Sequence, residues 1–419
     1  MSAAMMSPEE VIFVGMDVGT TKVCALVGHL NEEGEVRVIG VGIAPSQGMR
    51  KGGVVSLEGV ARAVEAAKDK AERSSGYEIT SALVSLSGAQ IASLNSKGMA
   101  GVSGRIIGTD DVARALDAAR SIALPYNRQV IHVIPRGYVV DGQDGIKSPL
   151  GMHGFRLEVE AHIVTAASTA LRNMEKAFEA AGLAIDGWVL GPLASAEVVL
   201  TETEREMGVV LCDIGGGTCD MAVYIEGAVW HTAVIPVGGD HLTSDIAQGL
   251  HLPHETAETV KQRHGHARVS AIDPNEMIAV RPFGEDKSVQ YRRTDLAAVI
   301  EPRVEELFGL VRQEIKRSGY DGLLPAGMVL TGGTSLLPGI RDVASDVLRL
   351  PVRVGEAEQL QGLVDQLRSP SFSASLGLLE WARLQDEQSR LDGRSLAGFS
   401  IPKLDLARAA DFFKRLLPG

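Results

Sequence analysis

The sequence predicts an α/β fold built from two related lobes, and a repeated segment is the main reason. Residues 209–224 contain an apolar run, a turn with Asp213 and three glycines, and a second apolar run. Residues 13–30 repeat this pattern, and a chain of 419 residues exceeds what one hydrophobic core usually supports. A repeat that covers a whole supersecondary unit indicates two halves that face each other.

The later copy is predicted to be a strand hairpin with a phosphate-sized mouth. Glycines without Cβ atoms let successive backbone N–H groups point at one anion, and the hydroxyl of Thr218 adds a donor. An acidic residue beside a phosphate requires a cation between them, so Asp213 is predicted to hold Mg²⁺ through water. An ordinary glycine-rich hairpin is the alternative interpretation. The turn itself consists of Gly215, Gly216, Gly217 and Thr218.

The earlier copy matches the later one residue by residue. Asp17 corresponds to Asp213 and is likewise predicted to hold Mg²⁺ through water. Both copies lead to paired glycines, and Gly239 of the second pair is assigned to the site. A nucleotide between the halves would have its phosphates held from both sides. In the same comparison Gly19 corresponds to Gly215, and the turn of the earlier copy consists of Thr20, Thr21 and Lys22.

Composition narrows the class of protein. The net charge of −12 argues against a general nucleic-acid-binding surface, which needs clustered Lys and Arg. Cys24, Cys212 and Cys219 all lie in the two hairpins and are interpreted as small buried residues in a reducing cytoplasm. The first ten residues lack a basic and apolar leader, and no run approaches the length of a membrane span. A cytoplasmic protein is expected, with attachment to a surface left open.

The first half is predicted to occupy residues 1–84 and 166–204, with an inserted α+β subdomain at 85–165. Apolar residues at helical spacing predict a helix over 54–75, and another helix is predicted over 168–182 with Ser168 as its N-cap. A strand is expected over 184–190, and the next helix begins near a hinge between the halves.

The second half is predicted to occupy residues 205–240 and 321–382, the latter including a return to the first half, with a smaller subdomain at 241–320. Residues 240–265 read as helical, and Glu258 and Lys261 share a face of that helix. The carboxylate could accept from a ribose hydroxyl while the Lys stem covers a base. A surface ion pair is the alternative interpretation.

A glycine pair after the predicted strand 328–331 completes the nucleotide pattern. Gly332 and Gly333 allow a flat heterocycle to lie on the backbone, and the following helix start, from Thr334, offers N–H donors toward phosphate. Such a turn is weak evidence alone. Its value comes from the order of hairpin, hairpin and Gly-Gly turn.

That order resembles the actin, Hsp70 and sugar-kinase superfamily. The segment Asp17-Val-Gly-Thr-Thr-Lys resembles its first phosphate motif, Asp213-Ile-Gly-Gly-Gly-Thr its second, and Leu330-Thr-Gly-Gly-Thr its adenosine motif. Residues 200–208, 231–240, 257–265 and 299–303 look specifically like FtsA, the bacterial cell-division actin homologue. The resemblance implies an actin-like fold with duplicated ribonuclease-H-like halves, and ATP with Mg²⁺ as cofactors.

The C-terminal segment bears on the same family. Residues 383–402 are polar and are predicted to form a flexible linker, and residues 403–419 a short amphipathic helix. Such a helix can lie in an anionic membrane interface, although docking on a protein core fits the pattern equally well. FtsA proteins end in a membrane-targeting helix, which favours the membrane. The expected contacts are Phe412, Phe413, Lys414, Arg415, Leu416 and Leu417.

Three functions are compared. The resemblance implies an ATP-dependent adaptor that polymerises at the inner face of the cell membrane, receives the C-terminal peptide of FtsZ on its smaller second-half subdomain and recruits later division proteins. A sugar or carboxylate kinase would need a base near the first hinge helix, where Gly191-Pro192 stands and Glu197 lies further along. That departure weakens the kinase hypothesis and leaves at most slow ATP hydrolysis, with no catalytic residue assigned. A chaperone of the Hsp70 type would need a longer C-terminal domain.

Overall fold

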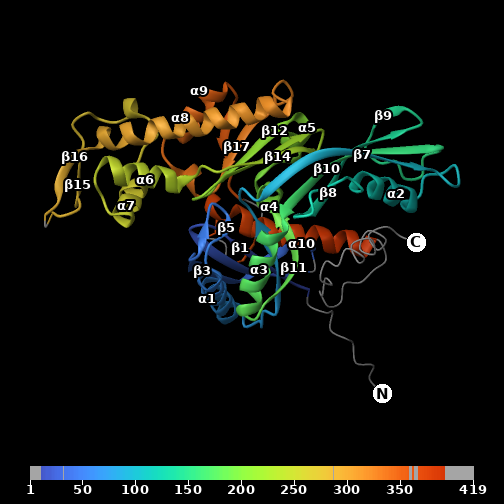
Figure 1. The fold of residues 1–419 in the computed structure, drawn as a ribbon, viewed down its shortest axis with the longest axis horizontal. Helices are drawn as coiled ribbons and strands as arrows, with labels where there is room; N and C mark the ends of the chain where they lie inside the picture. The colour runs from blue at the N-terminus through green and yellow to red at the C-terminus, as the bar shows by residue number, and fades with distance from the viewer. Residues whose placement is uncertain (1–10, 32, 286, 358–360, 363–366, 392–419) are drawn as a thin grey trace, which may run out of the picture.

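The computed structural model describes residues 11–391, apart from 32, 286, 358–360 and 363–366. Two β-sheets form the cores of two lobes, one above the other in Figure 1, and helices α4 (Gly191–Val199) and α10 (Ser373–Leu391) run between them. The inserted subdomain projects to the right of the upper lobe in this view, beyond α4. The predicted membrane helix 403–419 lies outside the described residues.

The first lobe is built on a six-stranded sheet in the order β11-β6-β1-β2-β3-β19. Strands β1, β2 and β3 are antiparallel neighbours, whereas β6 and β11 continue the sheet in parallel with β1. Helices α1 (Leu57–Ser75) and α3 (Ser168–Ala180) contribute buried residues to its core. Its strands are β1 (Ile12–Val18), β2 (Lys22–Leu30), β3 (Val36–Pro45), β6 (Ser81–Leu86), β11 (Ala184–Leu190) and β19 (Gln361–Gly362), with the small hairpin β4 (Met49–Arg50) and β5 (Gly53–Val54) beside it.

The second lobe repeats this arrangement in a sheet ordered β14-β13-β12-β17-β18. Its first three strands are antiparallel, and the last two continue in parallel, as in the first lobe. The duplication predicted from the two hairpins is therefore confirmed. The strands are β12 (Val209–Ile214), β13 (Cys219–Ile225), β14 (Ala228–Ile235), β17 (Gly327–Thr331) and β18 (Val352–Val354), with α5 (Glu202–Met207), α9 (Ile340–Leu348) and the short 3-10 helices η2 (Gly333–Leu336) and η3 (Pro370–Phe372) around them.

A smaller group of elements extends the second lobe. The prediction of one helix over 240–265 is wrong, because the chain breaks at Leu250–Pro253 into α6 (Gly239–Gly249) and α7 (His254–His264). His251 adopts a left-handed φ and Pro253 lacks a backbone N–H donor, so a continuous helix cannot form there. The other elements are η1 (Val269–Ala271), β15 (Met277–Val280), β16 (Val289–Arg292) and the long α8 (Arg293–Ser318).

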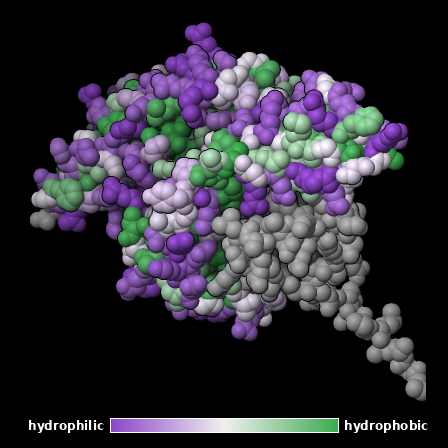
Figure 2. Space-filling model, turned by 45° about the vertical axis from the view of Figure 1, so that its right-hand side comes forward, coloured by the Kyte–Doolittle hydropathy of each residue, from purple (hydrophilic) through white to green (hydrophobic). Residues whose placement is uncertain are grey.

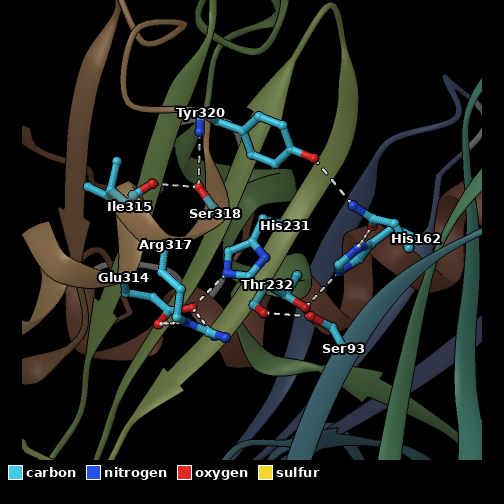
Figure 3. Close-up of polar contacts among 10 residues, drawn as sticks. Ser93, His162, His231, Thr232, Glu314, Ile315, Arg317, Ser318 and Tyr320 are labelled. Atoms are coloured by element: carbon cyan, nitrogen blue, oxygen red, sulfur yellow. Dashed lines mark hydrogen bonds and ion pairs between the residues drawn. The ribbon is translucent and has the colours of Figure 1, made fainter.

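The inserted subdomain is an antiparallel sheet in the order β7-β10-β8-β9, covered by one helix. It leaves the first lobe after β6 and returns through α3, yet its sheet contacts the second lobe along β14 (Figure 3). Ser93 Oγ donates to Thr232 O at 2.7 Å across this boundary. Its elements are β7 (Ile91–Gly101), α2 (Thr109–Arg120), β8 (Arg128–Val140), β9 (Gln143–Ile146) and β10 (Arg156–Ala167).

Helix ends differ from the predictions at three places. The first predicted helix starts at Leu57, because residues 53–54 form β5 and Ser56 caps the helix. Ser168 is not an N-cap, since β10 runs directly into α3 and Ala167 takes that position. The linker predicted from residue 383 is helical as far as Leu391, because Arg383 pairs with Glu380 and Glu387 one turn away on either side.

Candidate functional site

The turn of the first hairpin is closed by a bond from Gly19 N to Lys22 O of 2.9 Å. The second hairpin has the same closure, from Gly215 N to Thr218 O at 2.9 Å. Because the two turns share this geometry, the sequence match between them extends to the backbone. Each turn lies where its apolar strand pair ends, so it leaves the core and lines a cleft between the lobes.

The two turns meet each other across the cleft. A Cβ placed on Gly216 would lie 2.6 Å from Thr21 Cγ2, and one on Gly217 would lie 2.6 Å from Thr20 Oγ1. These positions therefore require glycine, since any side chain would push the hairpins apart. Behind the turn, Asp240 N donates to Gly216 O at 2.8 Å, which ties the start of α6 to the second hairpin.

Asp17 and Asp213 are the next-to-last residues of β1 and β12, and both line the cleft. Asp213 accepts from Ser195 Oγ at 2.6 Å, and Asp17 accepts from Ser85 Oγ at 2.5 Å. Burial raises the pKa of Asp213 to about 6, and the nearby charge of Asp17 adds to this shift. A carboxylate whose ionisation is opposed by a neighbouring carboxylate is a suitable place for a cation.

The sequence analysis missed a third carboxylate at this position. Asp220 on β13 is buried, lines the cleft and accepts from Thr218 Oγ1 at 2.7 Å. In this structure the Thr218 hydroxyl therefore donates to Asp220, where the sequence analysis expected a donor for phosphate. Burial raises the pKa of Asp220 to about 7, with the charges of Asp213 and Asp17 acting in the same direction. The sequence does contain a signal for this residue, because Asp220 stands two positions after Thr218 in the same hairpin.

The Gly-Gly turn after β17 closes another side of the cleft. Gly332 has φ +82°, and a Cβ there would lie 2.4 Å from Asp213 Oδ1. Thr334 Oγ1 donates to Gly215 O at 2.9 Å, so this turn is bonded to the second hairpin. Gly333 begins η2 and also lines the cleft. The structure thus brings together the three segments that sequence order had linked.

Glu258 and Lys261 lie on α7 and form the ion pair that was the alternative interpretation, with Nζ and Oε2 2.7 Å apart. Both nevertheless line the cleft. Lys261 Nζ also donates to Gly239 O at 3.0 Å, so the pair holds the start of α6. The pKa of Glu258 is lowered overall, since the Lys261 charge and hydrogen bonds outweigh the raising effect of its burial.

Lys22 reaches from the first hairpin to the end of the second half. Its Nζ donates to Ser371 O at 2.5 Å and lies 4.2 Å from the centre of the Phe372 ring. The cation therefore sits at the rim of the cleft, where it adds positive charge beside the turns.

The cleft that these segments enclose has a volume of about 1090 Å³. Backbone N–H groups, hydroxyls and Lys22 on one part of its wall suit an anion, and apolar Leu336 and Leu337 on another part suit a flat ring. Within the described residues, no group of three or more His, Cys, Asp or Glu side chains is arranged to hold a metal ion. A cation here would therefore depend on carboxylate pairs and water.

The three cysteines are buried, as predicted, and carry no disulfide. Glu197, the nearest carboxylate on the first hinge helix, pairs with Arg205 at 3.0 Å and does not contribute to the cleft wall described here. Among the described helices, none combines the length and apolar character that crossing a bilayer requires.

Solved structures share this two-lobed architecture. The PilM–PilN type IV pilus biogenesis complex matches with a TM-score of 0.65 and 17% identity, covering 89% of this chain and 98% of that one. MreB5 of Spiroplasma citri bound to ADP matches with a TM-score of 0.54 and 15% identity, covering 92% and 99%. With the duplicated sheets, these matches define an actin-like fold.

Sequence relatives then specify the family. The cell division protein FtsA of Pseudomonas aeruginosa is 44% identical over 386 residues, covering 92% of both chains. FtsA of Escherichia coli K12 is 39% identical, covering 97% of this chain and 96% of that one, and FtsA of Bacillus subtilis is 35% identical, covering 94% and 87%. The chain belongs to the FtsA family of cell division proteins.

Family descriptions agree with this assignment. Residues 210–377 match the family model for cell division protein FtsA, and residues 88–165 match the family model for the SHS2 domain inserted in FtsA. The inserted subdomain is therefore a family feature. The kinase alternative is not favoured by these relatives.

Proposed function

We propose that this FtsA-family protein binds ATP with Mg²⁺ in the cleft between its lobes and uses the bound state to assemble at the membrane. The observation that carries the proposal is the meeting of two matching hairpin turns with the Gly-Gly turn around one cavity. A structure of MreB5 of Spiroplasma citri, a protein with the same fold, is bound to AMPPNP, which supports a nucleotide as the ligand.

The chemistry of each wall suggests how the ligand lies. The backbone N–H groups of Gly216 and Gly217, with Thr20, Thr21 and Lys22, would hold the phosphates. Asp17 and Asp213 would hold Mg²⁺ through water, and the cation would offset the charge of phosphates and carboxylates together. The base and ribose would lie among Gly332, Gly333, Glu258 and Lys261.

The proposed assembly has three further contacts. Copies of the protein would polymerise, residues 403–419 would hold the polymer on the inner face of the cell membrane, and the smaller second-half group of elements would receive the C-terminal peptide of FtsZ. Several weak membrane helices on one polymer would act together. Exposed apolar side chains on the inserted subdomain offer contacts for another copy or a later division protein. They are Met99, Ile106, Leu150 and Phe155. Figure 2 shows hydrophobic and hydrophilic residues mixed over the face in view.

Sedimentation with liposomes tests the membrane part. The full chain is compared with a chain ending at Asp392, which retains every described helix and strand because α10 ends at Leu391. We expect ATP-dependent sedimentation of the full chain alone on anionic liposomes. If both chains stay in the supernatant, the membrane adaptor is wrong. Adding FtsZ tests the partner, since only liposomes carrying the full chain should bring FtsZ into the pellet.

A glycine substitution tests the nucleotide part. Gly216→Val places its side chain against Thr21 and Asp240, so we expect it to abolish ATP binding measured by calorimetry. Gly101→Val is the control, because a Cβ there meets open space at the end of β7. Unchanged binding by Gly216→Val would show that the second hairpin does not hold phosphate.

A further inference from the structure

Helices α4 and α10, the two hinge helices, lie between the two lobes. α4 follows the first sheet in the chain, yet its Leu193 and Ala196 belong to a core cluster with Leu211 of the second sheet. α10 comes after β18 of the second sheet and the short β19 of the first, and its Leu376 and Leu379 belong to a cluster with Leu26 and other residues of the first sheet. Ala194 of α4 also belongs to the first-lobe cluster, and Trp381 of α10 also packs against the second-lobe cluster, so both helices are packed on both lobes.

The same two helices touch each other at a backbone contact. A Cβ on Gly377 of α10 would lie 1.8 Å from Ala194 O of α4. Only glycine permits this approach, so the relative position of the helices is fixed by direct backbone packing. A shift of one helix must be felt by the other.

Each helix carries a buried serine next to this contact. Ser195 of α4 donates from Oγ to Asp213 Oδ2 at 2.6 Å, and Ser375 of α10 donates from Oγ to Asp17 Oδ2 at 3.3 Å. Both serines have an exposed fraction of 0%. The two hydroxyls thus reach the two cleft aspartates, one in each lobe, from helices that are packed together.

We propose that Ser195 and Ser375 are positioning residues, which orient Asp213 and Asp17 toward the magnesium of the bound nucleotide and make that orientation depend on the packing of the hinge helices. A hydroxyl that donates to a carboxylate oxygen fixes the rotation of the carboxylate, and the lone pairs that remain on the two oxygens can accept from the cation's water shell. The inference rests on the proposed binding of ATP with Mg²⁺.

The two serines are expected to differ in how much they contribute to magnesium-dependent ATP binding. Asp17 keeps a second donor, Ser85, at 2.5 Å, and its bond to Ser375 is long at 3.3 Å. Asp213 depends on the shorter bond from Ser195. Loss of a group that orients a metal ligand typically weakens metal binding about tenfold or more. Ser195→Ala should therefore have the larger effect.

The test measures ATP affinity of the full chain by calorimetry, once with Mg²⁺ and once with EDTA. We expect Ser195→Ala to weaken the affinity about tenfold in Mg²⁺ and to leave it unchanged in EDTA, with Ser375→Ala showing the same pattern to a smaller extent. The control is Ser345→Ala on α9, whose hydroxyl donates to Leu350 O away from the cleft. It should change neither value.

The ratio of the ATP affinity in Mg²⁺ to that in EDTA distinguishes a loss of carboxylate orientation from general damage to the packing. An equal loss in Mg²⁺ and EDTA, or no loss in either, overturns the inference while leaving ATP binding in place. If Ser195→Ala does not fold, Ser375→Ala alone decides between the same outcomes. A parent chain that binds no ATP overturns the proposed function, and this inference with it.

Discussion

His162 Nε2 lies 2.9 Å from Thr232 Oγ1, and this contact joins β10 of the inserted subdomain to β14 of the second lobe (Figure 3). The other ring nitrogen lies 2.7 Å from Asn95 Oδ1, and Asn95 Nδ2 donates to Tyr320 OH at 3.3 Å. The imidazole is only 1% exposed. The inserted subdomain is thus joined by the chain to one lobe and by a polar network around the buried His162 to the other.

Removal of this imidazole should loosen the boundary. We expect His162→Ala to lower the free energy of unfolding by about 1–3 kcal/mol, because the buried hydroxyl of Thr232 loses a hydrogen-bond partner and the ring leaves a cavity. Urea unfolding measures the loss, and amide hydrogen exchange should rise in β7 and β14. His153→Ala, at an exposed position, is the control. Unchanged exchange in both strands would show that the network does not hold the subdomain.

The same histidine should contribute to acid sensitivity. Burial lowers the pKa of His162 to about 3 from an ordinary value of 6.5, and the charges of His231 and Arg136 add to this. Below pH 6.5 His162 is therefore protonated in the unfolded chain but stays neutral in the folded protein. The free energy of unfolding falls as the pH falls toward 3. Between pH 6.5 and 5 this effect amounts to about 2 kcal/mol.

Comparison of urea unfolding at pH 7 and pH 5 isolates this effect. The parent should lose more stability than His162→Ala over that range, since the variant lacks the titrating group. Equal losses would mean that the ring already binds its proton in the folded protein near pH 6.

Gly332 gives a prediction with a neighbouring control. Ala at this position would adopt φ +82° and place its Cβ 2.4 Å from Asp213 Oδ1, so Gly332→Ala should lower the free energy of unfolding by about 1–3 kcal/mol. Ala at Gly333 meets nothing closer than Ser371 Cβ at 3.6 Å, at an unstrained φ. Urea unfolding should therefore rank Gly333→Ala close to the parent. A similar loss in both variants would contradict the account given for Gly332.

Local sequence patterns account for much of this fold. The repeated apolar strands around Asp17 and Asp213 identify both hairpins, because side-chain alternation and glycine turns are encoded by neighbouring residues. The helix prediction over 240–265 failed because apolar spacing continues across a break that Pro253 imposes. The linker prediction failed from residue 383 because polar side chains can also form ion pairs along a helix.

The residues of the candidate site likewise include some that the sequence predicts and some that it does not. Turn residues such as Gly216 were predictable, since a run of glycines indicates a tight turn whose backbone can be approached closely. The partners of the aspartates were not: Ser195 lies 18 residues from Asp213, and Ser375 lies 358 residues from Asp17. No periodicity within one segment reports a contact made by packing of distant helices, so these serines required the three-dimensional arrangement.

Asp220 supplies the final prediction, a gain of stability on loss of a charge. Burial raises its folded pKa to about 7 from 3.8, so between pH 3.8 and 7 the folded protein binds more protons than the unfolded chain. The parent is therefore destabilised as the pH rises through this window, and the cost persists above pH 7. Asp220→Asn has no charge to bury and keeps an oxygen that can accept from Thr218.

Unfolding of this variant in EDTA without nucleotide should thus show a higher urea midpoint than the parent at pH 8, with a smaller advantage at pH 5. EDTA matters, because a bound cation would offset the same charge in the parent. Asp144→Asn, at an exposed position on β9, should show no such pH-dependent advantage. A variant less stable than the parent at pH 8 would mean that the bonds from Thr218 and Gly88 to the ionised carboxylate outweigh the cost of its burial.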